Sequence, residues 1–365
     1  MKKILCITES LAGGGAEHQM TILCNLLQKK GYQVTLLTYA DLQDHYTIDE
    51  GIERVKIAEH KSSIAKLWWL CIYILKTDAE CVISYRSPCN MRVMIPALFR
   101  HNIMYIVGER NTNVSGKPNK YEKWNVDRGL YRSATYIVAN SRTQAEYLKK
   151  RKPEWWKKIN FIINYTDLDQ FHVSKMPDSD IVRIAIFARL SPQKNPIRFV
   201  NMLRRLKTRT LQRFTVDWYS NYEDNKGNPT PEYLEIKNHI EECGVEDVIT
   251  IKKAVKNPAE FMDQYHAICL PSLYEGFSNS IAEGICSAKP MLVSDVSDNS
   301  TMVHDGINGF LFDPQNIESM VDAFLKFFDT TSEQKNKMAS QSRLIAEELF
   351  DEKRFINEYI KLIEK

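Results

Sequence analysis

The segment that decides the fold is His266-Ala-Ile-Cys-Leu-Pro-Ser-Leu-Tyr-Glu-Gly-Phe-Ser-Asn-Ser-Ile-Ala-Glu283. It begins with a short apolar run typical of a buried parallel strand, and the proline and glycine that follow predict a turn. The last residues predict a helix with Ser278 as its N-cap. Glu275 is therefore expected at the carboxyl end of a strand, where open α/β sheets bind ligands.

This segment offers groups that suit both an anion and a sugar. Backbone N–H groups in the first turn of the predicted helix lack partners within the helix and could bind an anion. The carboxylates of Glu275 and Glu283, eight residues apart, could accept hydrogen bonds from sugar hydroxyl groups. The alternative is that Glu275 is simply solvated and Glu283 only caps the helix.

Strand and helix patterns alternate along most of the chain. In the first half, strands are predicted at 4–8, 33–39, 81–84, 103–107 and 135–139, and helices at 16–30, 62–77, 89–100, 118–132 and 141–151. A polar stretch at 166–181 follows. Beyond it, strands are predicted at 182–188, 213–219, 247–251, 266–270 and 290–294, and helices at 196–208, 231–243, 257–264, 279–287, 316–328, 332–348 and 351–364. This alternation predicts two Rossmann-like α/β domains that face a cleft.

Composition and charge exclude several classes of protein. The chain is 44% hydrophobic and 26% charged, as in soluble globular proteins. Its longest apolar run, 64–75, is too short to span a bilayer. The eight cysteines have no metal-binding spacing and indicate a reduced, cytosolic protein. Residues 1–170 carry 25 Lys or Arg against 17 Asp or Glu, so this half is expected to meet an anionic surface or substrate.

Two further loops carry groups that suit a diphosphate. Glycines 13–15 follow the first predicted strand and allow a phosphate to approach the backbone, although the loop matches neither G-x-G-x-x-G nor Walker A. Arg189 and Lys194 flank the turn after the strand at 182–188, and both cations could reach one diphosphate. The alternatives are a turn that only requires glycine and two ordinary surface cations.

The chain contains three of these motifs in a particular order. They are Gly-Gly-Ala-Glu at 14–17, Arg-Leu…Lys-Asn at Arg189 and Lys194, and Glu-x7-Glu at Glu275 and Glu283. With them the chain resembles the GT4-type retaining glycosyltransferases, which have the GT-B fold and transfer sugars from nucleotide donors. Residues 163–171 and 304–311 are similar to the family's inter-domain segment and late loop. The resemblance covers nearly the whole chain.

The resemblance also implies a division of the chain. An acceptor-side Rossmann-like domain is expected at 1–170 and a nucleotide-sugar-binding domain at 171–345. A C-terminal helix at 346–365 is expected to pack back toward the N-terminal domain.

The resemblance implies a role for each donor-site residue. Glu275 would bind hydroxyl groups of the donor sugar and Glu283 those of the ribose, while Arg189 and Lys194 would hold the diphosphate. Backbone groups at Gly14, Gly15, Gly276, Phe277, Ser278 and Asn279 would assist. No metal or other cofactor is expected, because cations and helix dipoles would stabilise the departing nucleoside diphosphate. The Asp-x-Asp sequences at 167–169 and 178–180 leave a metal site as the alternative.

Two loops depart from the family pattern. Tyr219-Ser-Asn-Tyr222 replaces the family's Gly-x-Gly, and Ala188 replaces the glycine before the arginine element. The first of these loops lies near the nucleotide base in the family. A UDP-sugar is expected in preference to a GDP-sugar, but the base stays open.

Two residues are candidates for the acceptor side. Glu109 and Arg110 follow the strand predicted at 103–107. Glu109 would act catalytically on the acceptor hydroxyl, and Arg110 would hold an acceptor phosphate. The alternative is that each forms a salt bridge with the other or with neighbours.

A basic segment is a candidate for contact with a membrane. From Lys149 to Lys158 it contains six cations and two tryptophans. Cations and interfacial tryptophans suit an anionic membrane surface, and Trp68 and Trp69 could add to it. The alternative is a solvated charge run with its tryptophans packed inward. No nucleic-acid-binding motif accompanies the segment.

These observations predict an enzyme at the cytoplasmic side of a membrane. It would transfer a sugar, with retention, to a lipid-linked oligosaccharide or a surface-polysaccharide precursor. The alternatives are a GT-B sugar-nucleotide epimerase, an NAD-dependent oxidoreductase with two Rossmann domains, and a non-catalytic sugar-binding protein. The absence of G-x-G-x-x-G counts against the oxidoreductase.

Overall fold

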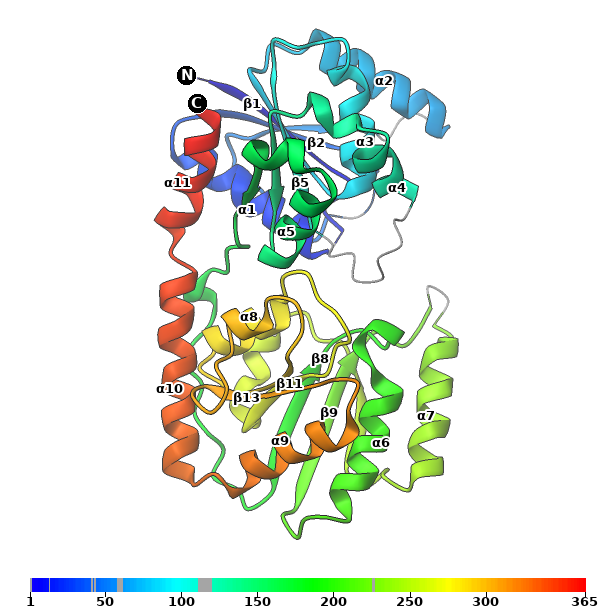
Figure 1. The fold of residues 1–365 in the computed structure, drawn as a ribbon, viewed down its shortest axis with the longest axis vertical. Helices are drawn as coiled ribbons and strands as arrows, with labels where there is room; N and C mark the ends of the chain where they lie inside the picture. Colours follow the sequence, from blue (N-terminus) through cyan, green and yellow to red (C-terminus); the bar gives the residue numbers. More distant parts are fainter. Residues whose placement is uncertain are drawn as a thin grey trace. The chain divides into compact units, whose positions relative to one another are not determined.

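The computed structural model describes residues 2–12, 14–40, 42, 44–57, 62–110, 120–224 and 227–365. The chain divides into two compact units (Figure 1). Unit 1 comprises Met1–Tyr165 and Asp351–Lys365, and unit 2 comprises Thr166–Phe350. Each unit is a parallel sheet flanked by helices, so the predicted pair of Rossmann-like α/β domains is confirmed.

Within the described residues, unit 1 contains a seven-stranded sheet in the order β3-β2-β1-β4-β5-β6-β7, with every pair parallel. The strands are β1 Lys3–Thr8, β2 Gln33–Thr38, β3 Glu53–Lys56, β4 Cys81–Tyr85, β5 Met104–Glu109, β6 Tyr136–Ala139 and β7 Ile159–Phe161. The α-helices are α1 Gly15–Lys29, α2 Ser63–Lys76, α3 Ser87–Ala97, α4 Lys120–Glu122, α5 Arg142–Arg151 and α11 Glu352–Ile363. Apolar residues of the central strands are buried on both faces, as parallel sheets require.

The last helix of the chain, α11, packs on α1 of unit 1. Phe355, Ile356 and Tyr359 join a buried cluster with Met20 and Leu23 of α1. Burial of these aromatic and aliphatic groups explains why the end of the chain returns to the unit where the chain began. The predicted packing of a C-terminal helix on the N-terminal domain is confirmed.

Unit 2 contains, within the described residues, a six-stranded sheet in the order β10-β9-β8-β11-β12-β13. The strands are β8 Val182–Phe187, β9 Phe214–Ser220, β10 Ile249–Lys253, β11 Ala267–Leu270, β12 Met291–Ser294 and β13 Gly309–Phe312. The α-helices are α6 Pro196–Lys207, α7 Pro231–Cys243, α8 Asn279–Cys286, α9 Ile317–Asp329 and α10 Ser332–Leu349. Helices α6, α7 and α9 pack together on one side of the sheet, and α8 packs with α10 (Figure 1).

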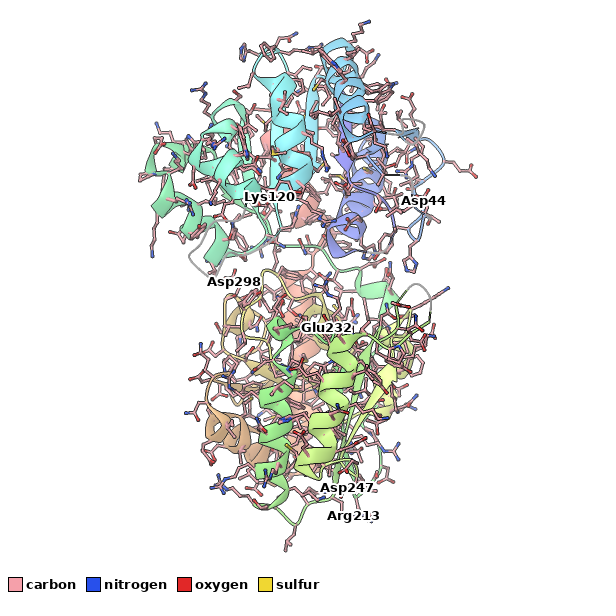
Figure 2. The ribbon with its side chains drawn as sticks, turned by 90° about the vertical axis from the view of Figure 1, so that its right-hand side faces the viewer. Asp44, Lys120, Arg213, Glu232, Asp247 and Asp298 are labelled. Atoms are coloured by element: carbon pink, nitrogen blue, oxygen red, sulfur yellow. The ribbon has the colours of Figure 1, made fainter. Side chains whose placement is uncertain are left out.

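The strand order of unit 2 identifies where a ligand site is expected. The chain moves outward from β8 through β9 to β10, and then returns to place β11 on the other side of β8. Such a reversal opens a crevice at the carboxyl ends of the two strands, where doubly wound sheets bind their ligands. Figure 2 shows Asp298, in the loop after β12, at the opposite end of unit 2 from Arg213, which precedes β9.

Some elements differ from their predictions. Strands β3, β7 and β13 were not predicted, since β3 is polar, β7 has three residues, and β13 lies in the segment assigned to a late loop. The helix predicted at 118–132 is divided into α4, a π-helical turn at Lys123–Asp127 and a 3₁₀ turn at Leu130–Ser133. Gly129, with a φ of 74°, separates the last two. The helix predicted at 257–264 is a 3₁₀ helix, Pro258–Gln264.

Two expectations about composition can be compared with the fold. Among the described residues, no helix is both long and apolar enough to cross a membrane. All eight cysteines fall within the described part of the chain, and all are free. Seven are buried, which fits the expected reduced state.

Candidate active site

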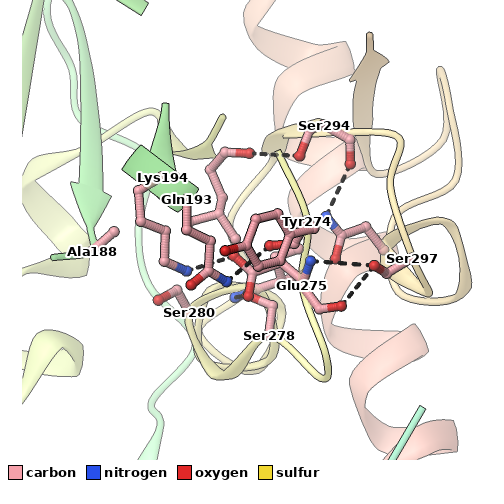
Figure 3. Close-up of polar contacts among 12 residues, drawn as sticks. Ala188, Gln193, Lys194, Tyr274, Glu275, Ser278, Ser280, Ser294 and Ser297 are labelled. Atoms are coloured by element: carbon pink, nitrogen blue, oxygen red, sulfur yellow. Dashed lines mark hydrogen bonds and ion pairs between the residues drawn. The ribbon is translucent and has the colours of Figure 1, made fainter. Parts of the chain in front are cut away.

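Three loops of unit 2 meet at the carboxyl edge of its sheet: 188–195 after β8, 271–278 after β11, and 295–299 after β12. The first two are joined by Gln193, whose backbone oxygen accepts from Leu273 N at 2.8 Å and whose side-chain nitrogen donates to Tyr274 O at 2.9 Å. The hydroxyl of Ser297 donates to Glu275 O at 2.7 Å (Figure 3). These bonds hold Glu275 in a fixed frame at the predicted crevice.

Lys194 and Glu275 form an ion pair within this frame. Lys194 Nζ lies 2.5 Å from Glu275 Oε1, and the two side chains are 13% and 7% exposed. Asn195 places the lysine, since it adopts a left-handed backbone with a φ of 59° and its side-chain nitrogen donates to Pro314 O at 2.8 Å. A cation and a carboxylate 81 residues apart in the sequence are thereby brought together.

The start of helix α8 lies beside this pair. Ser278 caps the helix, because its hydroxyl accepts from Ile281 N at 3.4 Å, and the predicted N-cap is confirmed. Ser280 donates to Phe187 O at 2.7 Å and ties the first turn of α8 to the end of β8. The positive end of the helix dipole is thus fixed at the edge where β8 and β11 end.

Arg189 has a fixed backbone and an unengaged side chain. Its neighbours are held, since Ala188 O accepts from the Trp218 indole at 2.8 Å and Leu190 N donates to Ser220 Oγ at 3.0 Å. The guanidinium is exposed, and within the described residues it has no hydrogen-bond or ion-pair partner. A free guanidinium on a rigid loop suits an anionic ligand.

Glu283 lies in α8 without a polar partner for its carboxylate in the described structure. Burial raises the pKa of this carboxyl group from 4.5 to about 7. Glu283 and Arg189 do not bond to the pair formed by Lys194 and Glu275. The structure therefore joins two of the four predicted side chains directly and leaves two with unused hydrogen-bonding capacity.

Glu283 predicts a pH dependence of stability. Its folded pKa exceeds the unfolded value, so its contribution is fully present below about pH 4.5 and is lost as the pH rises through 7. Relative to Glu283→Gln, the wild-type free energy of unfolding should fall between pH 4.5 and 8, by at most about 3 kcal/mol. Urea denaturation of both proteins at several pH values measures this difference. If the free energies of unfolding of the two proteins change in parallel with pH, the pKa assigned to Glu283 is wrong.

In unit 1, Gly14 of the glycine loop lies against the buried carboxylate of Glu17. Gly14 is the N-cap of α1, and a Cβ there would lie 2.1 Å from Glu17 Oε2. Glu17 is buried and forms an ion pair with Arg86 at 2.6 Å. Helix α1 begins at Gly15, and Gly13 lies outside the described residues. Packing of Glu17 is therefore one physical reason for glycine at position 14.

Arg86 was not identified from the sequence. It has a φ of 77°, a conformation that non-glycine residues rarely adopt, and it follows β4 directly. Its position after a predicted strand was the available signal. Backbone strain, however, cannot be inferred from an arginine in a sequence.

Glu109 and Arg110 both lie in the interior of unit 1. The Glu109 carboxylate accepts from Tyr131 and from Ser87, the latter at 2.7 Å, and burial raises its pKa above the ordinary value. Arg110 donates to Asn164 at 2.7 Å. It also donates to Tyr359 of α11 at 2.8 Å and lies over the Tyr85 ring. Both groups are thus bonded to neighbours and not to each other.

The basic segment from Lys149 to Lys158 is largely engaged within unit 1. Arg151 pairs with Glu122 and Asp127. Lys158 donates to the carbonyl oxygens of Tyr131, Arg132 and Ala134. Lys149 pairs with Glu146, and Lys152 lies 3.9 Å from Glu154. Of its tryptophans, Trp155 is buried and Trp156 is 60% exposed.

The residues that could hold a metal ion are dispersed. Among the described residues, no group of three His, Cys, Asp or Glu side chains is close enough to bind one. In the first Asp-x-Asp sequence, Asp167 instead accepts from the backbone of Asp169 and from the side chain of Gln170.

Comparisons with known proteins match nearly the whole chain. The family model described as Glycosyltransferase Family 4 matches residues 13–170, and that described as Glycosyl transferases group 1 matches residues 170–344. A relative from Campylobacter jejuni is N-acetylgalactosamine-N,N'-diacetylbacillosaminyl-diphospho-undecaprenol 4-alpha-N-acetylgalactosaminyltransferase. It is 25% identical over 342 residues, which cover 88% of each chain.

Solved structures share the fold at low sequence identity. Sucrose-phosphate synthase from Thermosynechococcus elongatus has a TM-score of 0.82 at 14% identity, over 100% of this chain and 98% of that one. Anabaena HepE in complex with UDP and glucose has a TM-score of 0.80 at 16% identity, over 100% of both chains. Two parallel-sheet units of this kind define the GT-B fold. The chain belongs to the GT4-type glycosyltransferase family.

Proposed function

We propose that the protein transfers a sugar, with retention and without a metal, from a nucleotide-sugar donor to a lipid-linked oligosaccharide or a surface-polysaccharide precursor. The observation that carries the proposal is the Lys194–Glu275 pair at the start of α8. It places a cation, a carboxylate and a helix N-terminus at the switch point of unit 2, which suits a diphosphate linked to a sugar.

The proposed roles follow from charge and position. Arg189 and Lys194 would neutralise the diphosphate, and the charge that develops as it departs would be stabilised by them and by α8. Glu275 would accept hydrogen bonds from hydroxyl groups of the sugar, and Glu283 from those of the ribose. The backbone groups of Gly276, Phe277, Ser278 and Asn279 lie between these two carboxylates in sequence. Donor-binding roles for Gly14 and Gly15 stay predictions.

Similar proteins support the proposed substrates. HepE was solved with UDP and glucose, which favours UDP as the nucleotide of the donor in this chain. The name of the Campylobacter jejuni relative includes diphospho-undecaprenol, which favours a lipid-linked acceptor. The acceptor-side roles of Glu109 and Arg110 stay predictions, because both side chains are buried and bonded within unit 1.

A transfer assay tests the proposed reaction. Purified full-length protein is supplied with UDP- and GDP-sugars, one at a time, and with a polyprenyl-diphosphate-linked saccharide. We expect transfer from a UDP-sugar at a rate that EDTA does not change. Nuclear magnetic resonance of the product should show the anomeric configuration of the donor.

Other products would contradict this proposal. Release of an epimerised nucleotide sugar would identify an epimerase. Glycan binding without turnover of any donor would identify a sugar-binding protein. Loss of transfer in EDTA, restored by a divalent cation, would overturn the metal-independent reaction.

A further inference from the structure

Helix α2 of unit 1 exposes a continuous row of large apolar side chains, the apolar stripe Ile64, Trp68, Ile72 and Leu75. These residues are 76%, 66%, 46% and 39% exposed, respectively. Their spacing of four, four and three residues puts them on one face of the helix. Three other residues of the helix, Leu70, Cys71 and Ile74, are buried, and Leu70 and Ile74 belong to the core of unit 1. Figure 1 shows α2 as an outer helix of this unit.

The stripe is unusual for a helix that meets only water. Single exposed apolar residues are common on protein surfaces, but a contiguous row with a tryptophan at its centre marks an interaction site. A solvated face normally carries charged residues. The exposed face of α2 instead carries two isoleucines, a leucine and a tryptophan.

The helix is held firmly at both ends. Ser62 caps its start by accepting from Ala65 N at 3.1 Å. Arg100 donates to Ile74 O at 2.9 Å and to Leu75 O at 2.7 Å, and so satisfies carbonyl groups of its last turn. The stripe is therefore presented by a rigid element.

The charge around the stripe favours an anionic partner. Helix α2 contains Lys66 and Lys76 and no acidic residue. Neither ammonium has an ion-pair or hydrogen-bond partner among the described residues. Lys76 is exposed near the end of the stripe. A cation beside an apolar face with tryptophan is typical of helices that lie in the interface of an anionic bilayer.

We propose that the apolar stripe of α2 docks unit 1 on an anionic lipid bilayer, with Ile64, Trp68 and Ile72 inserted at the boundary between headgroups and acyl chains. The inference rests on the proposed function in one respect: a lipid-linked acceptor gives the docking its purpose. Lys76 contacts lipid phosphates, and the tryptophan occupies the interfacial region that this side chain prefers.

A second copy of the chain suits the stripe less well than a bilayer. Two α2 helices packed against each other would supply Lys76 from each copy and no carboxylate from either helix. The basic segment from Lys149 to Lys158 is also a weaker candidate, because Arg151 and Lys158 are used within unit 1. Its exposed Trp156 therefore provides a matched control for Trp68.

Vesicle flotation tests the docking surface. Full-length protein is mixed, without donor or acceptor, with vesicles of phosphatidylethanolamine and phosphatidylglycerol, or of phosphatidylcholine alone. We expect the wild type to float with the anionic vesicles. Trp68→Ser should weaken binding by about tenfold, and Trp68→Ser with Ile72→Ser should abolish it. Trp156→Ser should bind like the wild type. Brominated lipids should quench fluorescence of the wild type more than that of Trp68→Ser.

Three outcomes would overturn the inference: no binding by the wild type, equal binding by the double variant, or greater loss in Trp156→Ser than in Trp68→Ser. A dimer in sedimentation that Trp68→Ser dissociates would assign the stripe to a second copy instead. Thermal unfolding checks that the exposed substitutions leave the fold intact. Turnover of a detergent-soluble acceptor should be unchanged in Trp68→Ser, so failure of docking and failure of the proposed transfer are observed separately.

Discussion

Arg189→Ala is expected to lower kcat/KM for sugar transfer by about a thousandfold while leaving the melting temperature unchanged. The guanidinium is exposed and has no partner in the described structure, so its removal deprives the fold of no contact. It lies on the rigid loop after β8, where it would meet the charge that develops on the departing diphosphate. Steady-state kinetics and thermal unfolding of the same preparations measure both quantities.

Two control variants make this prediction specific. Arg213→Ala removes another exposed arginine of unit 2, at the opposite end of the unit from Asp298 (Figure 2), and should leave kcat/KM unchanged. Arg189→Lys keeps the charge but loses the planar pair of donors, so an intermediate rate is expected. Equal activity in wild type and Arg189→Ala would remove this residue from the site. A large drop in melting temperature would show that its role is structural.

Removing either charge of the Lys194–Glu275 pair is expected to reduce both activity and stability. Lys194→Met leaves a buried carboxylate without a partner, and Glu275→Gln leaves an unpaired ammonium. Each change should lower the free energy of unfolding by about 3 kcal/mol, because a buried ion is left uncompensated. Each should also lower kcat/KM at least about a hundredfold, since the lysine and the carboxylate would bind different parts of the donor.

The double variant separates the structural contribution from the catalytic one. With both charges absent, Lys194→Met with Glu275→Gln should regain most of the lost stability, because no unpaired charge remains. Activity should not return. Urea denaturation and transfer assays on all four proteins complete the cycle. A double variant that regains both stability and transfer would show that the pair only stabilises unit 2.

Local sequence signals sufficed for much of the fold and for part of the site. The run 266–270, followed by a turn and a serine cap, predicted the strand, the loop and the helix that hold Glu275. All three signals act within a few residues: strand burial, turn formation and capping. The alternation of such segments then predicted parallel sheets, because parallel strands need crossovers.

Features that depend on tertiary contacts could not be predicted in the same way. Strand β13 forms beside β12, where a Cβ on Gly309 would lie 2.0 Å from Met291 O, but no local pattern indicates that approach. Arg151 forms part of a charge run in the sequence, and its partners Glu122 and Asp127 lie more than twenty residues away. The motif around Glu109 likewise carries no information about its burial.

Hydrogen–deuterium exchange of the full-length protein, with and without UDP, tests the central claim most directly. The nucleotide of another donor replaces UDP if that donor is the one that supports transfer. We predict slower exchange in 188–195 and 271–283, the segments that contain Arg189, Lys194, Glu275 and the start of α8. Binding that protects other parts of unit 2 but leaves both of these segments unchanged would contradict the account.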